Sequence, residues 1–218
     1  MIKKVVGLYF SPIGGTEMMT EALAKDVAGV LNDCSPDDIS VSMYDLRDAG
    51  DINTELDDET IAVIGMPVNM GKIPLPAAKA LAGLNASGAM ALTAVSYGGR
   101  SYGNALYELR QRAEDTGLKV IGAGAFMINY GAVRGSQRSA APAIDTAALS
   151  DFSKAASAKI KRLAGCDIEG LRIKPVPVEV RGRMPVHKIS RISPKAAAIA
   201  QEVCEKLCLM RRRSEWFL

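Results

Sequence analysis

Residues 3–20, KKVVGLYFSPIGGTEMMT, constrain the fold of this 218-residue chain more than any other segment. A short apolar run is followed at once by a turn rich in hydroxyl groups and glycine, and apolar residues then recur at helical spacing. A buried strand that leads through a tight turn into a helix leaves backbone N–H groups without internal partners. Because the helix dipole adds partial positive charge at the same place, the segment predicts an anion site, most simply for a phosphate.

The turn at residues 11–16 is not one of the common nucleotide loops. It lacks the Gly-Lys-Ser/Thr ending of a P-loop and the G-x-G-x-x-G pattern of a dinucleotide site. The hydroxyls of Ser11 and Thr16 and the amides between them could surround a terminal phosphate, since Gly14 and Gly15 permit close approach of the backbone. A plain strand-to-helix turn with a glycine-rich cap accounts for the same residues equally well.

Beyond this turn, apolar strands alternate with helices along the chain. The predicted strands span 5–10, 39–44, 60–65, 89–95 and 119–126, and the predicted helices span 15–31, 75–84, the segment around Leu106, Leu109 and Ala113, and 145–163. The strands are continuous apolar runs, which is typical of sheets covered on both faces. We therefore predict an α/β fold with a doubly wound, five-stranded parallel sheet, for which the strand order 2-1-3-4-5 is a fold-level assumption.

Ligands of doubly wound sheets bind beyond the carboxyl ends of the strands. Three glycine-containing loops follow predicted strands, at 11–16, 66–74 and 96–103, and they converge on one crevice if the strand order is 2-1-3-4-5. Tyr97 and Tyr102 could offer aromatic faces to a planar ring there. Taken singly, each tyrosine is better explained as an ordinary half-buried loop residue.

Composition and charge narrow the function classes. The net charge of +3 is small and evenly mixed, so we predict no nucleic-acid partner, and no apolar run is long enough to span a bilayer. The first apolar run is too short for a secretory signal, so we expect a cytoplasmic protein. The four cysteines do not suggest a disulfide framework, and the single histidine, His187, excludes a multi-histidine metal site and a hydrolase triad. We predict neither a metal site nor a catalytic side chain.

Three segments of the chain read YFSPIG at 9–14, GMPVNMGKIP at 65–74 and YGGR at 97–100. In the same order they resemble the Tyr-Phe-Ser-x-Thr-Gly, Gly-x-Pro-Val-Tyr-x-Gly-x-x-Pro and Tyr-Gly-Asn-Arg segments of the flavodoxin half of two-domain flavodoxin–ferredoxin proteins, members of the flavodoxin-like superfamily. The resemblance covers residues 1–165. It implies FMN as the cofactor, with flavin redox chemistry that the protein tunes and no side chain acting as a nucleophile or an essential base.

The resemblance also implies which residues hold FMN. The phosphate would be held by Ser11, Ile13, Gly14, Gly15 and Thr16, one side of the isoalloxazine by Pro67, Val68, Asn69, Met70 and Gly71, and the other side by Tyr97, Gly98, Gly99, Arg100 and Tyr102. Ile13 replaces a threonine hydroxyl and Asn69 replaces a stacking tyrosine, so each should weaken FMN binding by about 1 kcal/mol. Because these loops carry Lys72 and Arg100 but no Asp or Glu, we expect a less negative second reduction step than in flavodoxins with acidic flavin loops.

Residues 166–218 have a different character and are predicted to form a basic, proline-containing C-terminal tail outside the flavodoxin-like domain at 1–165. The family continues into a ferredoxin-like domain with two four-cysteine motifs, whereas here only Cys204 and Cys208 lie close together, too few thiolates for one cluster. The tail is therefore interpreted either as a remnant of that domain or as a disordered segment.

Three functions follow as hypotheses. The first is an FMN-binding protein that transfers electrons to or from a redox partner protein or a small-molecule donor or acceptor. The second is an NAD(P)H-dependent flavin or quinone reductase. The third is a degenerate flavodoxin fold that holds another phosphorylated ligand or none. The sequence leaves the oligomeric state open.

Overall fold

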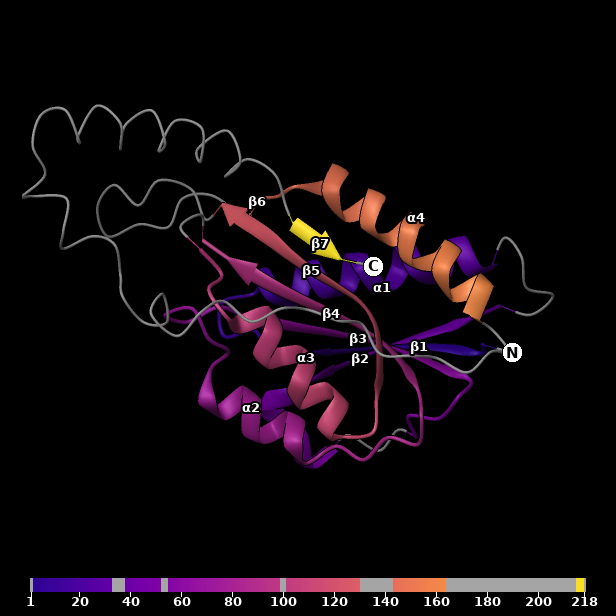
Figure 1. Cartoon of the computed structure of the whole chain (residues 1–218), viewed down its shortest axis with the longest axis horizontal. Helices are drawn as coiled ribbons and strands as arrows, with labels where there is room; N and C mark the ends of the chain where they lie inside the picture. The colour runs from indigo at the N-terminus through magenta and orange to yellow at the C-terminus, as the bar shows by residue number, and fades with distance from the viewer. Residues whose placement is uncertain are drawn as a thin grey trace, which may run out of the picture.

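The computed structural model describes residues 2–32, 38–51, 55–98, 101–129, 143–163 and 215–217. Its middle layer is a parallel sheet (Figure 1) formed by β1 (Lys4–Tyr9), β2 (Ser40–Asp45), β3 (Thr60–Pro67), β4 (Met90–Tyr97) and β5 (Lys119–Asn129). These strands lie in the order β2-β1-β3-β4-β5, and every neighbouring pair is parallel. The predicted α/β fold and its strand order 2-1-3-4-5 are confirmed.

Helices cover both faces of the sheet. Figure 1 shows α1 (Gly15–Asn32) and α4 (Thr146–Leu163) on one face, and α2 (Leu75–Ala82) and α3 (Ala105–Asp115) on the other. Each helix pair closes its own apolar core against the sheet, and all eight residues of β4 are buried between the two cores. This two-sided burial is the physical reason for the continuous apolar strands in the sequence.

The helix boundaries lie close to the predicted ones. Asp145 caps α4, because its Oδ1 accepts a hydrogen bond of 3.1 Å from the backbone N–H of Ala148. A short 3₁₀ helix, η1 (Leu46–Asp51), lies in the acidic connection between β2 and β3. None of the helices among the described residues is long and apolar enough to cross a membrane.

Strand β5 departs from regular geometry at one residue. The register with β4 passes from Ala91 opposite Val120 to Leu92 opposite Gly122, so Ile121 is an extra residue in a bulge. Side chains satisfy the carbonyls released there: Lys159 Nζ donates to the Ile121 oxygen at 2.8 Å, and a threonine hydroxyl of β4 donates to the Gly122 oxygen at 3.4 Å. Burial, with a smaller effect of the Arg162 charge, lowers the pKa of Lys159.

Two short antiparallel strands pair with β5 and extend the sheet. β6 (Ala143–Ile144) pairs with the end of β5, and β7 (Glu215–Phe217) pairs with its middle, where Gly124 lies opposite Trp216. They cover the backbone of a strand that would otherwise be an open sheet edge. Of the predicted tail, these three residues of β7 are the described part. The rest of the tail, with Cys166, Cys204, Cys208 and His187, lies outside the described residues, and so does Cys34 earlier in the chain.

Candidate functional site

The turn between β1 and α1 lies at the carboxyl end of the central strands. Gly14 has φ of +86°, a left-handed conformation that favours glycine, and its carbonyl accepts the first helical hydrogen bond of α1, from the Met18 N–H at 3.1 Å. A Cβ on Gly14 would meet no atom of the described residues within 4 Å, so none of them fills the space above this turn. The first N–H groups of α1 therefore border on free space, which is the geometry of an anion site.

Two buried hydroxyls belong to this turn. Ser11 is 2% exposed, and its Oγ has no hydrogen-bond partner among the residues that the structure describes. Thr16 is equally buried, and its Oγ1 lies 2.8 Å from Ser96 Oγ at the end of β4. A buried hydroxyl without a partner costs about 1–3 kcal/mol. The turn thus contains a buried donor that the described residues leave without a partner.

Gly65 of β3 brings the start of α1 down onto the sheet. A Cβ at Gly65 would lie 1.8 Å from Thr20 Oγ1 and 3.4 Å from Thr16 Cγ2, so any other residue would push the helix away. Thr20 Oγ1 in turn donates to the Thr16 carbonyl at 2.8 Å. The position of Thr16 is therefore fixed from below as well as through Ser96.

The loop after β3 is a tight hairpin. The N–H of Asn69 donates to the carbonyl of Lys72 at 2.8 Å, and the reverse bond measures 3.0 Å. Met70 and Gly71 between them have φ values of 51° and 78°, the two consecutive left-handed residues of a type I′ turn. Met70 is 80% exposed at its tip. The predicted ring-side residues of this loop thus present backbone groups and one flexible apolar side chain.

Backbone contacts join this hairpin to the loop after β4. The Val68 N–H donates to the Ser96 carbonyl at 2.9 Å, and the Asn104 N–H donates to the Gly71 carbonyl at 2.8 Å. Gly103 packs so closely that a Cβ on it would lie 2.7 Å from the Cα of Gly71. Loops 66–74 and 96–103 therefore form one connected wall, although Gly99 and Arg100 lie outside the described residues.

The two predicted ring-side tyrosines contact each other. Their rings meet edge to face, with centroids 5.6 Å apart and planes 61° apart. Tyr97 is only 8% exposed and belongs to the core between the sheet and α2 and α3, whereas Tyr102 is half-buried at the margin of that core. Gly98, next to Tyr97, is exposed, and a Cβ there would meet nothing within 4 Å. Among the described residues of this loop, Gly98 and Ser101 are exposed and Tyr102 is half-buried.

Acidic groups flank the other side of the turn. Tyr9 Oη donates to Glu17 Oε1 at 3.2 Å, and burial, followed by the negative charges of Glu17 and Asp45, raises the pKa of Tyr9 to about 12. Burial would raise the pKa of Asp45, but its hydrogen bonds to Arg47 outweigh that effect, and the pKa is lowered. Glu17 is thus held toward β1 by Tyr9.

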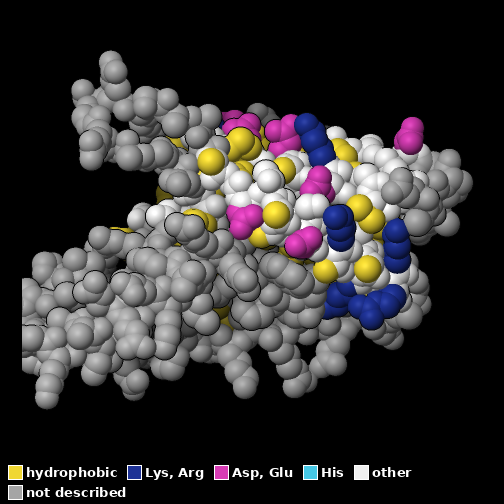
Figure 2. Space-filling model, turned by 90° about the horizontal axis from the view of Figure 1, so that it is seen from above, with side chains coloured by type: hydrophobic (Ala, Val, Ile, Leu, Met, Phe, Trp, Pro, Cys, Tyr) yellow, Lys and Arg dark blue, Asp and Glu magenta, His cyan; other side chains and the backbone are white. Residues whose placement is uncertain are grey.

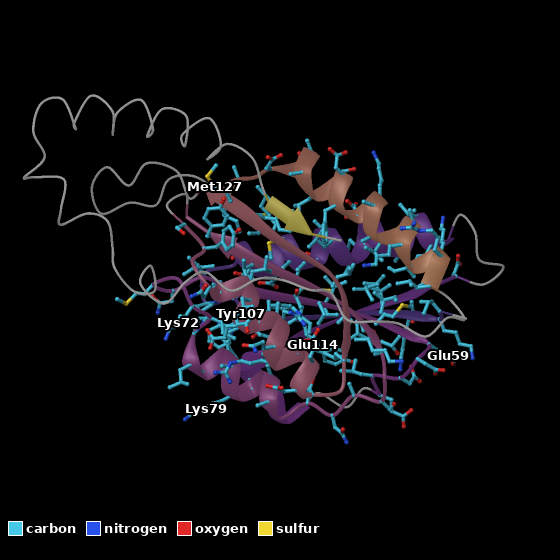
Figure 3. All side chains as sticks on the ribbon, viewed as in Figure 1. Glu59, Lys72, Lys79, Tyr107, Glu114 and Met127 are labelled. Carbon is cyan, nitrogen blue, oxygen red and sulfur yellow. The ribbon has the colours of Figure 1, made fainter. Side chains whose placement is uncertain are left out.

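The rest of the described surface shows no cluster of metal-binding groups. In Figure 3, Lys72 and Met127 lie at the end of the molecule where the strands end, and Glu59 lies at the opposite end. Figure 2 shows acidic and basic side chains side by side on the described part of the face that α4 covers. Within the described ranges, no group of three or more His, Cys, Asp or Glu residues could hold a metal ion.

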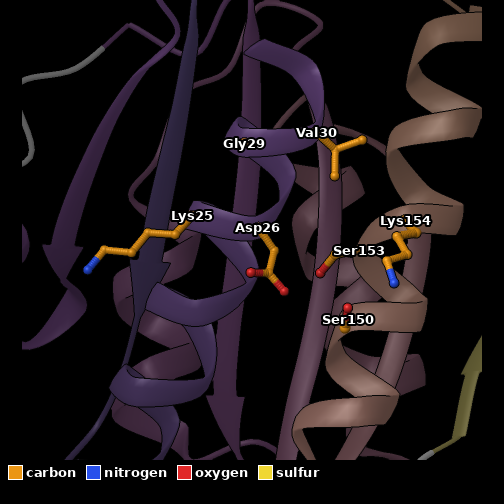
Figure 4. Close-up of a pocket in the computed structure, with 7 residues that line it drawn as sticks. All are labelled: Lys25, Asp26, Gly29, Val30, Ser150, Ser153 and Lys154. Atoms are coloured by element: carbon orange, nitrogen blue, oxygen red, sulfur yellow. The ribbon is translucent and has the colours of Figure 1, made fainter. Parts of the chain in front are cut away.

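A hollow of about 380 Å³ lies elsewhere, between the middle parts of α1 and α4. Figure 4 shows Asp26 of α1 and Ser150 and Ser153 of α4 beside it. Ser153 Oγ donates to the Leu149 carbonyl at 2.8 Å, and Lys25 pairs with Glu21 at 2.6 Å. The side chains of Ser153 and Lys25 are therefore engaged by their own helices. The hollow does not adjoin the three loops.

Solved structures share this architecture. An oxidoreductase from Corynebacterium diphtheriae aligns with a TM-score of 0.55 at 13% identity, over 75% of this chain and 97% of that one. Parallel strands in the order 2-1-3-4-5 with helices on both faces define the fold. The protein has the flavodoxin-like fold. A flavodoxin from the domain Archaea also aligns, at 18% identity and a TM-score of 0.47, over 72% of this chain and 99% of that one.

An NADH:FMN oxidoreductase in its apo form aligns at 16% identity with a TM-score of 0.49, over 72% of this flavodoxin-like chain and 89% of that one. Neither the protein-family models nor the curated proteins give a match to the sequence. The strand order and the likeness to the Corynebacterium diphtheriae oxidoreductase support the fold.

The structure brings the predicted loops to one edge of this flavodoxin-like sheet, because β1, β3 and β4 are neighbours whose carboxyl ends coincide. It also gives specific contacts to Ser96, Gly65 and Gly103, which the sequence placed in the candidate segments without assigning them a role. A polar residue or a glycine at the end of a buried strand was the signal available for the first two. Their partners lie far away in the sequence, so spacing alone did not reveal their roles.

Proposed function

We propose that the protein binds FMN in the crevice formed by the loops at 11–16, 66–74 and 96–103 and acts as a redox flavoprotein. The observation that carries the proposal is the buried, unpartnered hydroxyl of Ser11 in the turn that leads into α1. A phosphate there would accept hydrogen bonds from Ser11, from the first amides of α1 and from Thr16. The flavodoxin-like fold places ligands at this edge of the sheet.

The chain's own residues would hold and orient the cofactor. Ser11, Ile13, Gly14, Gly15 and Thr16 would bind the phosphate, and Ile13 would do so only through its backbone, because its side chain is apolar and 48% exposed. The ring would lie against the hairpin of Pro67, Val68, Asn69, Met70 and Gly71 on one side and against Tyr97, Gly98, Gly99, Arg100 and Tyr102 on the other. When bound, FMN supplies one- or two-electron transfer.

The domain proposal follows from the same residues. All three loops belong to residues 1–165, which we propose as the FMN-binding unit, and 166–218 as a separate segment. The reaction partner is a redox protein or a small-molecule electron donor or acceptor. Consumption of NADH or NADPH by the FMN-loaded protein, with a quinone as acceptor, would identify a reductase. Absence of that activity together with reversible flavin reduction would favour an electron-transfer protein.

Ser11→Ala gives the sharpest test of the phosphate site. Removal of an unpartnered buried hydroxyl should raise the free energy of unfolding of the ligand-free protein, by up to about 1 kcal/mol, since a desolvated group is lost without a lost bond. The same substitution should weaken FMN binding about five- to tenfold, because a donor to the phosphate is gone.

Flavin fluorescence titration and denaturant unfolding measure the two effects of Ser11→Ala. Ser153→Ala is the matched control, since Ser153 is an equally buried serine that already donates to the Leu149 carbonyl. It should lower stability and leave FMN affinity unchanged. Unchanged FMN affinity in Ser11→Ala would contradict the proposed site.

A further inference from the structure

Ser96 joins all three loops of the crevice. Its hydroxyl lies 2.8 Å from Thr16 Oγ1 in the first loop, and its carbonyl accepts a hydrogen bond of 2.9 Å from the Val68 N–H in the second. The residue itself stands next to the end of β4, where the third loop begins. Ser96 is 3% exposed, so its hydroxyl is shielded from bulk solvent. Its hydrogen-bond partners are therefore protein groups or a ligand in the crevice.

The pair of hydroxyls has a hydrogen to spare. Each hydroxyl carries one hydrogen and two lone pairs, and the bond between Thr16 and Ser96 uses one of the two hydrogens. If Ser96 donates, Thr16 is the acceptor and keeps its own hydrogen for a group above the start of α1. If Thr16 donates, its hydrogen is turned toward β4 and is lost to such a group.

We infer that Ser96 is a positioning residue for a phosphate monoester, because it donates to Thr16 Oγ1 and directs the Thr16 hydrogen toward the anion. This inference rests on the proposed function, in which Thr16 contacts the phosphate. An anion above α1 can accept a hydrogen bond from Thr16 only when Ser96 donates to Thr16. Binding of the anion therefore selects the orientation in which Ser96 is the donor. The chain of two hydroxyls also polarises the terminal donor and strengthens its bond.

Another buried hydroxyl on the same strand provides a matched control. Thr93 is completely buried, and its Oγ1 donates to the Gly122 carbonyl of β5 at 3.4 Å. Three positions separate it from Ser96, so the two side chains leave opposite faces of β4. Thr93→Val removes a buried hydroxyl of β4 without changing any contact of the first loop.

The test compares FMN with riboflavin, which lacks the phosphate. Dissociation constants are measured by flavin fluorescence for the full chain and for Ser96→Ala, Thr16→Val, the double variant and Thr93→Val. Ser96→Ala should weaken FMN binding about three- to tenfold and leave riboflavin affinity unchanged. The double variant should bind FMN no more weakly than Thr16→Val alone, because Ser96 acts through Thr16. Thr93→Val should leave the ratio of the two affinities at the wild-type value.

Several results would overturn the inference. Equal loss of FMN and riboflavin affinity in Ser96→Ala would indicate a purely structural role, and additive effects in the double variant would show that Ser96 does not act through Thr16. A wild-type protein that binds FMN no better than riboflavin would refute the phosphate site itself, and this result is distinguishable because it precedes any substitution.

Thermal unfolding of each ligand-free variant checks that it folds. If Ser96→Ala does not fold, Ser96→Cys keeps the side-chain shape with a weaker donor. An intermediate loss of FMN affinity with unchanged riboflavin affinity is then expected, and no loss of FMN affinity would count against the role of Ser96.

Discussion

The proposed phosphate end of the crevice, at residues 11–16, and its proposed ring end, at 66–74 and 96–103, are built by different means. At the phosphate end, buried hydroxyls and a helix start are fixed in place, and Ser11 lacks a partner among the described residues. At the ring end, the loops are closed by backbone bonds between themselves, Tyr97 is covered by the core, and Met70 projects into solvent. A preorganised group contributes more binding energy than one that must first be ordered. We therefore expect the proposed phosphate end to contribute more to cofactor affinity than the ring end.

Gly65→Ala should disrupt the structure of the phosphate end, and it has the largest expected effect of the substitutions. The new Cβ would lie 1.8 Å from Thr20 Oγ1, so α1 must move away from β3. We expect a loss of about 1–3 kcal/mol in the free energy of unfolding, as for other overpacked cores, together with loss of FMN binding. Denaturant unfolding and flavin titration measure the two effects.

The control for Gly65→Ala is Gly29→Ala, where a Cβ in α1 would meet nothing within 4 Å. Replacement of an exposed helical glycine should stabilise the protein by about 0.5–1 kcal/mol. Wild-type stability and FMN affinity in Gly65→Ala would show that α1 does not depend on this contact.

Gly103→Ala should break the ring end. It adds a Cβ 2.7 Å from the Gly71 backbone at a residue with φ of +55°, and the combined clash and strain should cost about 1–3 kcal/mol of stability. Because the phosphate end is intact, the loss of riboflavin affinity should be as large as the loss of FMN affinity. A selective loss of FMN affinity would contradict the division of the crevice into two ends.

Ile13→Thr and Asn69→Tyr restore the family residue at the two ends and are expected to strengthen FMN binding. Both positions are exposed, so neither change should alter the fold. Each should improve FMN affinity by about 1 kcal/mol, which is roughly fivefold. Ile13→Thr should act on FMN alone, whereas Asn69→Tyr should improve riboflavin binding equally. If both substitutions change FMN and riboflavin affinity equally, the division of the crevice into a phosphate end and a ring end is contradicted.

Lys72→Gln gives the smallest expected effect and probes charge at the ring end. A nearby cation favours the negatively charged reduced flavin, so its removal should make the second reduction step more negative. Lys72 is exposed, and an exposed charge interaction of about 0.2–1 kcal/mol corresponds to about 10–40 mV for one electron. Potentiometric titration of the FMN-loaded protein measures it, with Lys79→Gln in α2 as the control. Equal second reduction potentials in the Lys72→Gln and Lys79→Gln variants would contradict an effect of the Lys72 charge on the flavin.

The sequence contained enough information for the fold because local signals agreed. Continuous apolar strands alternating with amphipathic helices predict a covered parallel sheet, and glycine-rich turns mark the strand ends. The strand order was a fold-level assumption, because periodicity cannot establish which strands are neighbours. The loops that carry the candidate site were located by the same turn residues.

Long-range contacts explain what the sequence did not reveal. Thr16 and Ser96 are 80 residues apart, and Gly65 and Gly103 matter because of the neighbours that they admit. The side chain of Tyr97 packs largely into the core beside α3, because alternation along β4 sends it to that face, and its contact with a ring stays a prediction. The pairing of β7 with β5 joins segments separated by about 90 residues and leaves no mark in periodicity.

The ratio of the FMN and riboflavin dissociation constants of the unmodified chain tests most directly whether the turn at 11–16 binds a phosphate. Purified protein is stripped of flavin and titrated with each ligand under identical conditions. If the turn at 11–16 holds a phosphate through Ser11, Thr16 and the start of α1, FMN should bind at least about tenfold more tightly than riboflavin, which corresponds to one or two charge-assisted hydrogen bonds. Equal affinities, or no binding of either flavin, would contradict the account.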